Sequence, residues 1–324
     1  MYSQPENIME KYDLTVEQIN KGRGAYICVT EQGNKILVPY AGSKERADFL
    51  CRYLEYLQQQ NMIVEQIIRT TEGDTLAQDE LGDYYLLKDM CAGIECNPKK
   101  PEDLKAAVRL LAEYHQIARN CPLELPTFMQ EGAQTFVGVY ERRTRELVTV
   151  KNYIRSRKKK TEFEQLYQKA FSHFIDRAND VVQMFRQLPE DTDLLLCHGD
   201  FNHHNVHKIG PRWQLVNLEH LIYQPAMMDL ANFIRKMMEK NNWQAQLGCD
   251  LIEEYRKIRE ISPEAERQLF AMLAFPEKFW KLANHYNHSR KSWLSERDIQ
   301  KLRNVIAQED TKSLFLEKAF DFHA

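Results

Sequence analysis

The sequence predicts an α+β protein of two lobes, a small β-rich lobe over residues 1–91 and a large helical lobe over residues 92–324. Three observations lead to this prediction. Short apolar runs separated by turn-forming residues dominate the first part, as is typical of strands. Apolar residues recur at helical spacing through most of the remainder. A polar loop over residues 198–205 interrupts the helical part between two short apolar runs, and we expect the functional site there.

The first lobe should begin with a β-hairpin followed by a helix. Residues 25–30 and 35–40 are short apolar-rich runs, and the turn-prone residues 31–34 separate them. Ser43 can then cap a helix. The residues of its expected apolar face fall at helical spacing: Phe49, Leu50, Tyr53, Leu54 and Leu57. This face should pack on the sheet.

A second strand pair is expected in the same lobe. Residues 63–70 and 84–90 bracket a turn that contains glycine and acidic residues. Residues 92–93, Ala-Gly, should form a flexible link to the second lobe.

The second lobe should be mostly helical. Pro101 opens a segment whose apolar residues keep helical spacing, and residues 151–178 and 243–259 show the same periodicity. Residues 194–197 and 213–216 are short apolar runs that predict strands on either side of the polar loop.

Composition and charge exclude several classes of protein. The formal net charge of -3 gives no overall attraction to nucleic acid or to an anionic membrane. No apolar stretch approaches the roughly 20 residues that span a bilayer, and the first residues lack a signal-peptide pattern. The seven cysteines show no paired C-x-x-C spacing, which favours a reducing compartment over a disulfide framework or a zinc site. We therefore expect the protein to stay in the cytosol where it is made.

The polar loop carries the motif H-G-D-x-x-x-x-N, which begins at His198. In phosphotransferase catalytic loops with this spacing, the Asp accepts the proton of an attacking hydroxyl and the Asn holds a magnesium ion that bridges the nucleotide phosphates. Those positions are Asp200 and Asn205 here. The motif predicts a catalytic-type loop, with ATP and Mg²⁺ as candidate cofactors.

Other segments resemble known families. Residues 228–231 resemble the H-D-L-A of aminoglycoside and choline phosphotransferases, in which the Asp, here Asp229, braces the catalytic loop. Five segments resemble the spore coat protein S (CotS) family: residues 23–26, 92–96, 275–281, 284–286 and 291–293. The chain is therefore similar to that family over nearly its whole length.

This resemblance implies a protein-kinase-like fold of the aminoglycoside phosphotransferase type and a place in the spore coat. It also implies synthesis in the mother-cell cytoplasm, followed by assembly with other spore coat proteins. Nucleotide is a further candidate ligand, whereas nucleic acid and membrane are not expected partners.

Two positions depart from the phosphotransferase pattern. Where the broader family has a strand lysine that grips the α- and β-phosphates, this chain has Val38, and Lys35 should point to the opposite face of the strand. Asn217 stands where the broader family has a magnesium-binding Asp, and an amide is a weaker magnesium ligand than a carboxylate. We therefore expect the binding of ATP and Mg²⁺ to be weak or absent.

Two residues could compensate for these departures. Glu219 would share a face with Asn217 if that stretch is extended, and could then help to hold the metal. Lys88 lies on the strand expected beside that of Val38, and could replace the phosphate grip. It could equally be solvated or paired with an acid on the helix, which is the usual setting of a lysine.

Weaker signals have ordinary interpretations beside the functional ones. Gly22 and Gly24 could contact phosphate, although two glycines also suit a plain turn. The histidines within residues 203–207 match no usual zinc spacing and are expected to be loop residues. The basic run over residues 155–160 fits a solvated face, or a docking site for an acidic partner or a polyanion. The aromatic residues near the C-terminus should belong to the core: Phe279, Trp280, Tyr286 and Trp293.

The sequence supports three functions. The first is a coat component with a degenerate phosphotransferase site. The second is an active ATP-dependent phosphotransferase that acts on a hydroxyl acceptor such as a sugar or amino alcohol, with Asp200 as the base. The third is a regulator that binds nucleotide without transferring phosphate. The substitutions at Val38 and Asn217 favour the first.

Overall fold

The computed structural model describes residues 5–22, 24–130, 135–189, 193–289 and 295–320. The chain forms two compact units. The first unit comprises Met1–Asn97, Gln116–Thr127 and His198–Ile222, and the second comprises Pro98–His115, Phe128–Cys197 and Tyr223–Ala324. The lobe boundary expected between residues 91 and 92 stays a prediction.

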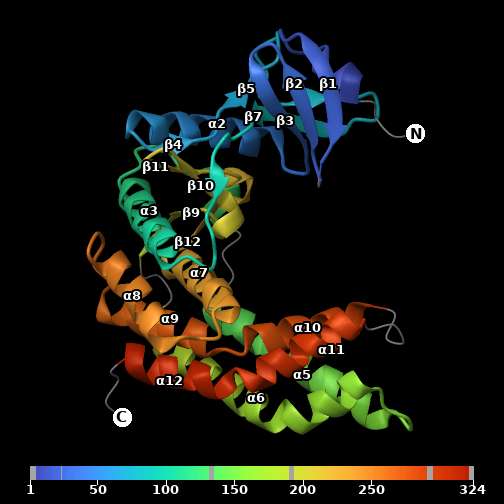
Figure 1. The fold of residues 1–324 in the computed structure, drawn as a ribbon, viewed down its shortest axis with the longest axis vertical. Helices are drawn as coiled ribbons and strands as arrows, with labels where there is room; N and C mark the ends of the chain where they lie inside the picture. Colours follow the sequence, from blue (N-terminus) through green and yellow to red (C-terminus); the bar gives the residue numbers. More distant parts are fainter. Residues whose placement is uncertain (1–4, 23, 131–134, 190–192, 290–294, 321–324) are drawn as a thin grey trace. The chain divides into compact units, whose positions relative to one another are not determined.

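An antiparallel sheet forms the N-terminal part of the first unit (Figure 1). Its strands follow the order β1 (Val16–Lys21), β2 (Tyr26–Thr30), β3 (Gly33–Tyr40), β7 (Tyr84–Asp89) and β5 (Ile67–Ile68), and β6 (Ala77–Gln78) also pairs with β7. The expected hairpin is confirmed as β2 and β3. The sequence does not predict β1, because polar residues fill most of it. Helix α1 (Pro5–Met9) contributes Ile8 and Met9 to the core of this sheet.

Helix α2 (Lys44–Gln59) begins where the sequence predicts. The Ser43 hydroxyl accepts a hydrogen bond from the Arg46 backbone N–H, which satisfies one of the free donors at the helix start. The five apolar residues of the expected face are all buried. The helix lies next to β4 (Ile63–Val64) (Figure 1).

A second sheet in the first unit follows the order β4, β11 (Arg212–Leu215), β10 (Val206–Ile209) and β8 (Ile94–Glu95). The strand pair expected over residues 63–70 and 84–90 is therefore confirmed only in part. Its first segment divides, because β4 runs parallel to β11 whereas β5 pairs with β7. The division lies at Glu65, whose buried carboxylate accepts a hydrogen bond from the Leu218 backbone N–H.

The flexible link expected at residues 92–93 is instead closely packed. A Cβ added to Gly93 would lie 2.8 Å from the carbonyl oxygen of Lys208 on β10. Glycine is needed at this position because two backbone segments approach closely, and the strand β8 follows at once.

The remaining helices lie mainly in the second unit, which is helical as expected. They are α3 (Pro101–Arg119), α4 (Thr127–Gln130), α5 (Phe136–Ser156), α6 (Glu162–Gln187), α7 (Met227–Lys240), α8 (Ala245–Arg256), α9 (Pro263–Ala274), α10 (Glu277–His288), α11 (Glu296–Ala307) and α12 (Glu309–Ala319). The strands β9 (Leu194–Cys197) and β12 (Ile222–Pro225) pair with each other. Two 3₁₀ helices, η1 (His203–Asn205) and η2 (Leu218–His220), belong to the first unit. Across the described residues, no helix combines the length and the apolar character that a membrane span requires.

The helical run expected over residues 151–178 consists of two helices. Helix α6 begins at a capping box, in which the Thr161 hydroxyl accepts from the Glu164 backbone N–H and the Glu164 carboxylate accepts from that of Thr161. The basic residues 157–160 lie between α5 and α6. Arg157 pairs with Glu164 at 3.1 Å, so at least this part of the basic run is tied to the fold.

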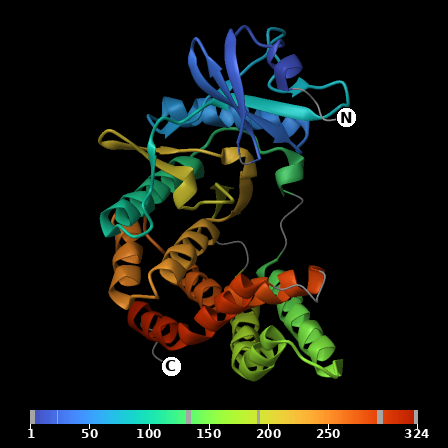
Figure 2. The same ribbon diagram turned by 45° about the vertical axis from the view of Figure 1, so that its right-hand side comes forward.

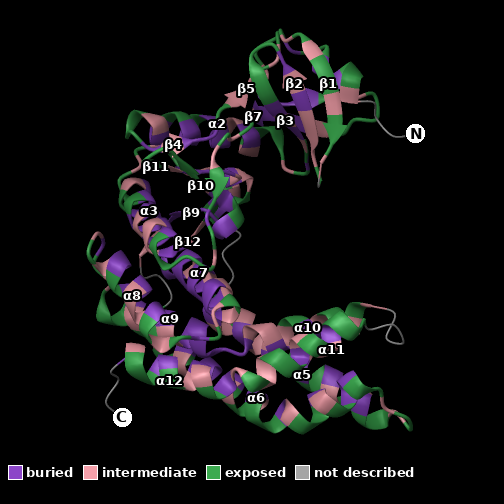
Figure 3. Ribbon diagram, viewed as in Figure 1, coloured by how far each residue is buried: buried purple, intermediate pink, exposed green. Residues whose placement is uncertain are grey.

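Phe279 and Tyr286 pack in the core, as expected, whereas Trp280 is only partly buried. Phe279 stacks on Tyr167 and Phe174, with ring centroids 4.6 and 4.2 Å apart. The Tyr286 hydroxyl donates a hydrogen bond to the buried carboxylate of Glu164. The green helices α5 and α6 lie beside the orange to red α10 and α11 (Figure 2), and buried residues line these helices (Figure 3). Trp293 lies outside the described residues.

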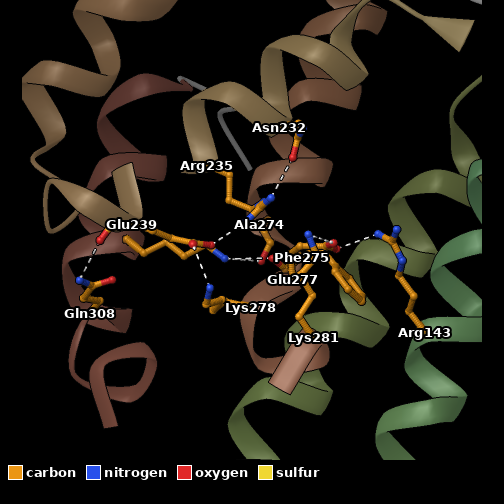
Figure 4. A network of polar contacts seen from close by, with 11 residues as sticks. Arg143, Asn232, Arg235, Glu239, Ala274, Phe275, Glu277, Lys278, Lys281 and Gln308 are labelled. Carbon is orange, nitrogen blue, oxygen red and sulfur yellow. Dashed lines mark hydrogen bonds and ion pairs between the residues drawn. The ribbon is translucent and has the colours of Figure 1, made fainter. Parts of the chain in front are cut away.

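Polar contacts join α7 to α10, where the Lys278 ammonium lies 3.8 Å from Glu239 (Figure 4). Glu239 accepts a hydrogen bond from Arg235 one turn earlier on α7. The buried ammonium of Lys312 donates to the carbonyl oxygens of Ala274 and Phe275, each at 3.1 Å. Burial lowers the pKa of Lys312 to about 8, although the nearby carboxylate of Glu309 opposes this shift.

We predict that stability rises with pH through Lys312. Its folded pKa lies below the ordinary value of 10.5, so the folded state binds fewer protons than the unfolded state and folding becomes more favourable as pH rises from 7 to 10. The free energy of unfolding of the wild type should rise by roughly 2 kcal/mol more than that of Lys312→Met over this range. Urea unfolding at each pH measures the difference, and a constant difference would contradict the prediction.

Candidate functional site

His198 holds the loop that follows β9. Its imidazole is fully buried, Nε2 donates to the Val216 carbonyl oxygen at 2.9 Å, and Nδ1 accepts from the Asp200 backbone N–H at 3.3 Å. These two bonds assign the ring hydrogen to Nε2. The next residue, Gly199, has a φ of 80°, and a Cβ there would lie 2.1 Å from the His220 carbonyl oxygen. The start of the motif is thus fixed by a side chain and by a close backbone approach.

Asp200 and Asn205 lie together. The Asp200 carboxylate accepts a hydrogen bond from Asn202 Nδ2 at 3.0 Å. Asn205, on η1, donates from Nδ2 to the Asp200 carbonyl oxygen at 2.9 Å. The loop therefore orients both polar side chains of the motif, and their catalytic and metal-binding roles stay predictions.

The side-chain amide of Asn217 forms hydrogen bonds with both Asn205 and Lys88. Asn217 has left-handed backbone torsions, with φ 64° and ψ 47°, a conformation that Asn tolerates better than most residues. Nδ2 donates to Asn205 Oδ1 at 2.8 Å, and Oδ1 accepts from Lys88 Nζ at 2.8 Å. The extended stretch assumed for residues 217–219 is wrong, because η2 begins at once. The turn nevertheless brings Glu219 to the same lysine.

Lys88 is almost completely enclosed, with 1% of its surface exposed. Its ammonium contacts Glu219 and lies 2.9 Å from Glu65 Oε2. Burial alone would lower the pKa of Lys88, but the charges of Glu65 and Glu219 outweigh it and hold the pKa above its ordinary value. The solvated interpretation is therefore wrong, and the paired acid Glu65 follows β4 rather than lying on α2.

Glu65 is the residue that sequence reasoning misses. It is 3% exposed, and its second oxygen, Oε1, accepts from the Leu218 backbone N–H at 3.0 Å. The only signal for it is an acidic residue inside the apolar run 63–68, where a buried charge must find a partner.

Strand register places Lys88 on the same face of the sheet as Val38. Val38 pairs with Leu86 of β7, and Lys88 lies two residues further along that strand, opposite Ile36. Side chains of directly paired residues share a face, and the face repeats every two residues. Lys35 takes the opposite face, as expected, and its ammonium lies 2.6 Å from Asp89.

The residues present do not fit a magnesium ion in this arrangement. Asn205 Oδ1 already accepts from Asn217, and both Asn217 Oδ1 and Glu219 Oε1 accept from Lys88. A divalent ion on these oxygens would lie beside the buried ammonium, and like charges repel strongly at such distances. Glu219 Oε2 is the exception, because it is buried and has no hydrogen-bond partner among the described residues.

The remaining candidates lie elsewhere in the first unit. Gly22 and Gly24 belong to the turn between β1 and β2, where the Gly22 backbone N–H donates to the Ala25 carbonyl oxygen at 2.8 Å. Residue 23, between them, lies outside the described residues. Phosphate contact at this turn stays a prediction. His204 Nδ1 lies 2.8 Å from a carboxylate oxygen of Glu95, so that histidine is engaged within the fold.

A buried group in the second unit has residue types that can bind metal: His115, Cys197 and Asp229. His115 Nδ1 lies 2.7 Å from the Tyr255 hydroxyl. Burial raises the pKa of the Cys197 thiol well above its ordinary value, and the charge of Asp229 adds to the shift. A thiol that keeps its proton is a poor metal ligand, so the group is best described as a polar cluster of the core. The bracing role expected for Asp229 stays a prediction.

Comparison with known sequences supports the resemblance found above. The family model described as "Spore coat putative kinase YutH" matches residues 5–319. Spore coat protein S of Bacillus subtilis (strain 168) is 22% identical over 326 residues, covering 96% of this chain and 92% of that protein. The predicted resemblance to spore coat proteins is confirmed.

Solved structures share the fold. An aminoglycoside phosphotransferase from Alicyclobacillus acidocaldarius has a TM-score of 0.84 at 18% identity, over 98% of this chain and 96% of that one. An amicoumacin kinase in complex with AMP-PNP, Ca²⁺ and Ami has a TM-score of 0.67 at 15% identity, over 98% and 95% of the two chains. These likenesses confirm the predicted α+β, protein-kinase-like fold of the aminoglycoside phosphotransferase type.

Gly199→Ala should destabilise the protein far more than Gly210→Ala. Both glycines have positive φ, 80° and 57°, so a side chain strains the backbone at either position. Only at Gly199 would the new Cβ clash, whereas no atom lies within 4 Å of it at Gly210. Urea unfolding should show a loss of roughly 1 kcal/mol for Gly210→Ala and at least about 3 kcal/mol for Gly199→Ala. Equal losses would mean that the approach to His220 does not constrain the loop.

Proposed function

The chain belongs to the spore coat YutH family, whose model matches nearly all of it, and from that membership we propose that it is a protein of the spore coat. The relative in Bacillus subtilis is itself named a spore coat protein. The proposed partners are other coat proteins. Synthesis would take place in the mother-cell cytoplasm, before the protein joins the coat.

We further propose that the phosphotransferase-type site is degenerate, so that the coat role is one of structure or binding. The amide of Asn217 carries this proposal, because its Nδ2 donates to Asn205 Oδ1 at 2.8 Å. A carboxylate at position 217 could not donate that bond, and the oxygen of an ionised Asp in place of Nδ2 would instead face Asn205 as an acceptor. With Asn at position 217, the two side chains that would hold the metal, Asn205 and Asn217, are instead hydrogen-bonded to each other.

An active phosphotransferase is the second candidate, and the placement of Lys88 on the face of Val38 favours it. In that case Asp200 would be the base, Asn205 with Asn217 or Glu219 would hold the metal, and Lys88 would grip the phosphates. The acceptor would be a hydroxyl compound such as a sugar or amino alcohol. The amicoumacin kinase with its bound AMP-PNP illustrates nucleotide binding by a protein of this fold.

Thermal unfolding with ATP tests the degenerate site. A ligand that binds only the folded state stabilises it, so the wild type should show no shift in Tm with about 10 mM ATP, with or without Mg²⁺. The variant Val38→Lys with Lys88→Met and Asn217→Asp, which also removes the buried ammonium beside residues 217 and 219, should gain about 2 °C when Mg²⁺ is present. A magnesium-dependent shift of the wild type, together with ATP turnover, would support the active phosphotransferase. A shift without turnover would support a nucleotide-binding regulator.

The coat role should not depend on Asp200. In a spore-forming host that lacks its own copy, a fluorescent fusion of Asp200→Ala should enter the coat as the wild type does, because a structural role does not require the catalytic base. Microscopy of the spores and quantification of the coat fraction measure assembly. A tenfold or greater loss of assembly for a folded Asp200→Ala protein would contradict a purely structural role.

A further inference from the structure

Two separate chain segments supply three oxygens around the nitrogen atom of a third segment. The Lys88 ammonium lies 2.9 Å from Glu65 Oε2 and 2.8 Å from Asn217 Oδ1, and it also contacts Glu219 Oε1. Lys88 comes from β7, Glu65 from the segment after β4, and the other two from the turn at η2. Such convergence of oxygens on one positive centre is how proteins surround a cation.

The ammonium has no donor left for a phosphate. A lysine side chain carries three N–H groups, and three acceptors already surround Nζ. A phosphate oxygen could be bound only if one of these contacts were broken. Lys88 therefore differs from a lysine that grips a nucleotide, which must offer an N–H toward the ligand.

The acidic partners require a positive charge beside them. The side chains of Glu65 and Glu219 are 3% and 14% exposed, so little water reaches them. Removing the cation would leave two carboxylates close together in a region of low polarity, which is strongly unfavourable. In a phosphotransferase with a bound metal, a divalent ion supplies the positive charge at the corresponding turn.

We infer that the Lys88 ammonium is the resident cation of this site and takes the place of a divalent metal ion. This inference deepens the proposed degenerate site and rests on it. Glu65 Oε2, Glu219 Oε1 and Asn217 Oδ1 are then latent metal ligands, of the hard oxygen type that Mg²⁺, Mn²⁺ and Ca²⁺ prefer. Glu219 Oε2, which has no hydrogen-bond partner in the described part of the chain, is a fourth oxygen of the same residue set.

Mn²⁺ binding to Lys88→Met without nucleotide tests the inference. Methionine keeps the apolar stem of the side chain and removes the ammonium, which frees the three oxygens. Electron paramagnetic resonance should show one bound Mn²⁺, at least about tenfold tighter than any binding by the wild type, and Mn²⁺ should raise the Tm of the variant. Binding of Mn²⁺ by the wild type as tight as by the variant would overturn the inference.

Lys35→Met is the matched control. Lys35 is also a buried strand lysine, with 7% of its surface exposed. Among the described residues it pairs with one carboxylate, that of Asp89, whereas Lys88 pairs with two. This variant should gain no Mn²⁺ binding, because one partly exposed carboxylate does not make a cation site. Equal gains in the two lysine variants would mean that any freed acid binds the ion, which would overturn the inference.

A second variant covers the event that Lys88→Met fails to fold. Lys88→Met with Glu65→Gln buries one negative charge less and still offers oxygens from residues 65, 217 and 219. It should bind Mn²⁺ more tightly than the wild type, and no gain would overturn the inference. The Mn²⁺ measurements contain no ATP, so they test the inference separately from the proposed function. If the proposed function is wrong, the wild type will instead show a magnesium-dependent response to ATP.

Discussion

The ion pair between Lys88 and Glu65 is the constraint on which the geometry of the candidate site depends. Both side chains are almost completely buried, 2% and 3% exposed, and removing one partner of such a pair typically costs about 3–5 kcal/mol. Glu65 also accepts a hydrogen bond from the Leu218 backbone. One carboxylate thus fixes β7, the segment after β4 and the turn at η2 together, because none of these segments can move without exposing or unpairing a charge.

From this pair, hydrogen bonds lead to the catalytic-type loop. Lys88 donates to Asn217, Asn217 donates to Asn205, and Asn205 donates to the carbonyl oxygen of Asp200. Each of the two amides donates through Nδ2 and accepts through Oδ1 along this path, so the orientation of each follows from its neighbour. The loop can therefore keep the form that phosphoryl transfer requires even where the transfer itself is absent, which is why fold and motif alone do not establish activity.

Local patterns were enough to predict the hairpin, α2 and the polar loop, because alternation, capping and motif spacing act within a few residues. The site could be predicted only in part. Glu65 lies 23 positions before Lys88 in the sequence, and the division of its segment between two sheets follows from tertiary pairing that no local pattern encodes. The left-handed conformation of Asn217 is likewise set by its two hydrogen bonds, although Asn is among the residues that allow it.

The departures from the phosphotransferase pattern form one consistent set rather than independent losses. A second lysine at position 38 would place another ammonium on the face of Lys88, from a backbone position about 7–8 Å away by strand geometry. A carboxylate at position 217 would bring a third acid to a single ammonium. With Val38 and the neutral Asn217, one lysine faces two acids and an amide, and the buried charges remain close to balance. Once Lys88 holds this position, the strand lysine and the metal-binding Asp are each disfavoured, so both substitutions follow from where a single positive charge is buried.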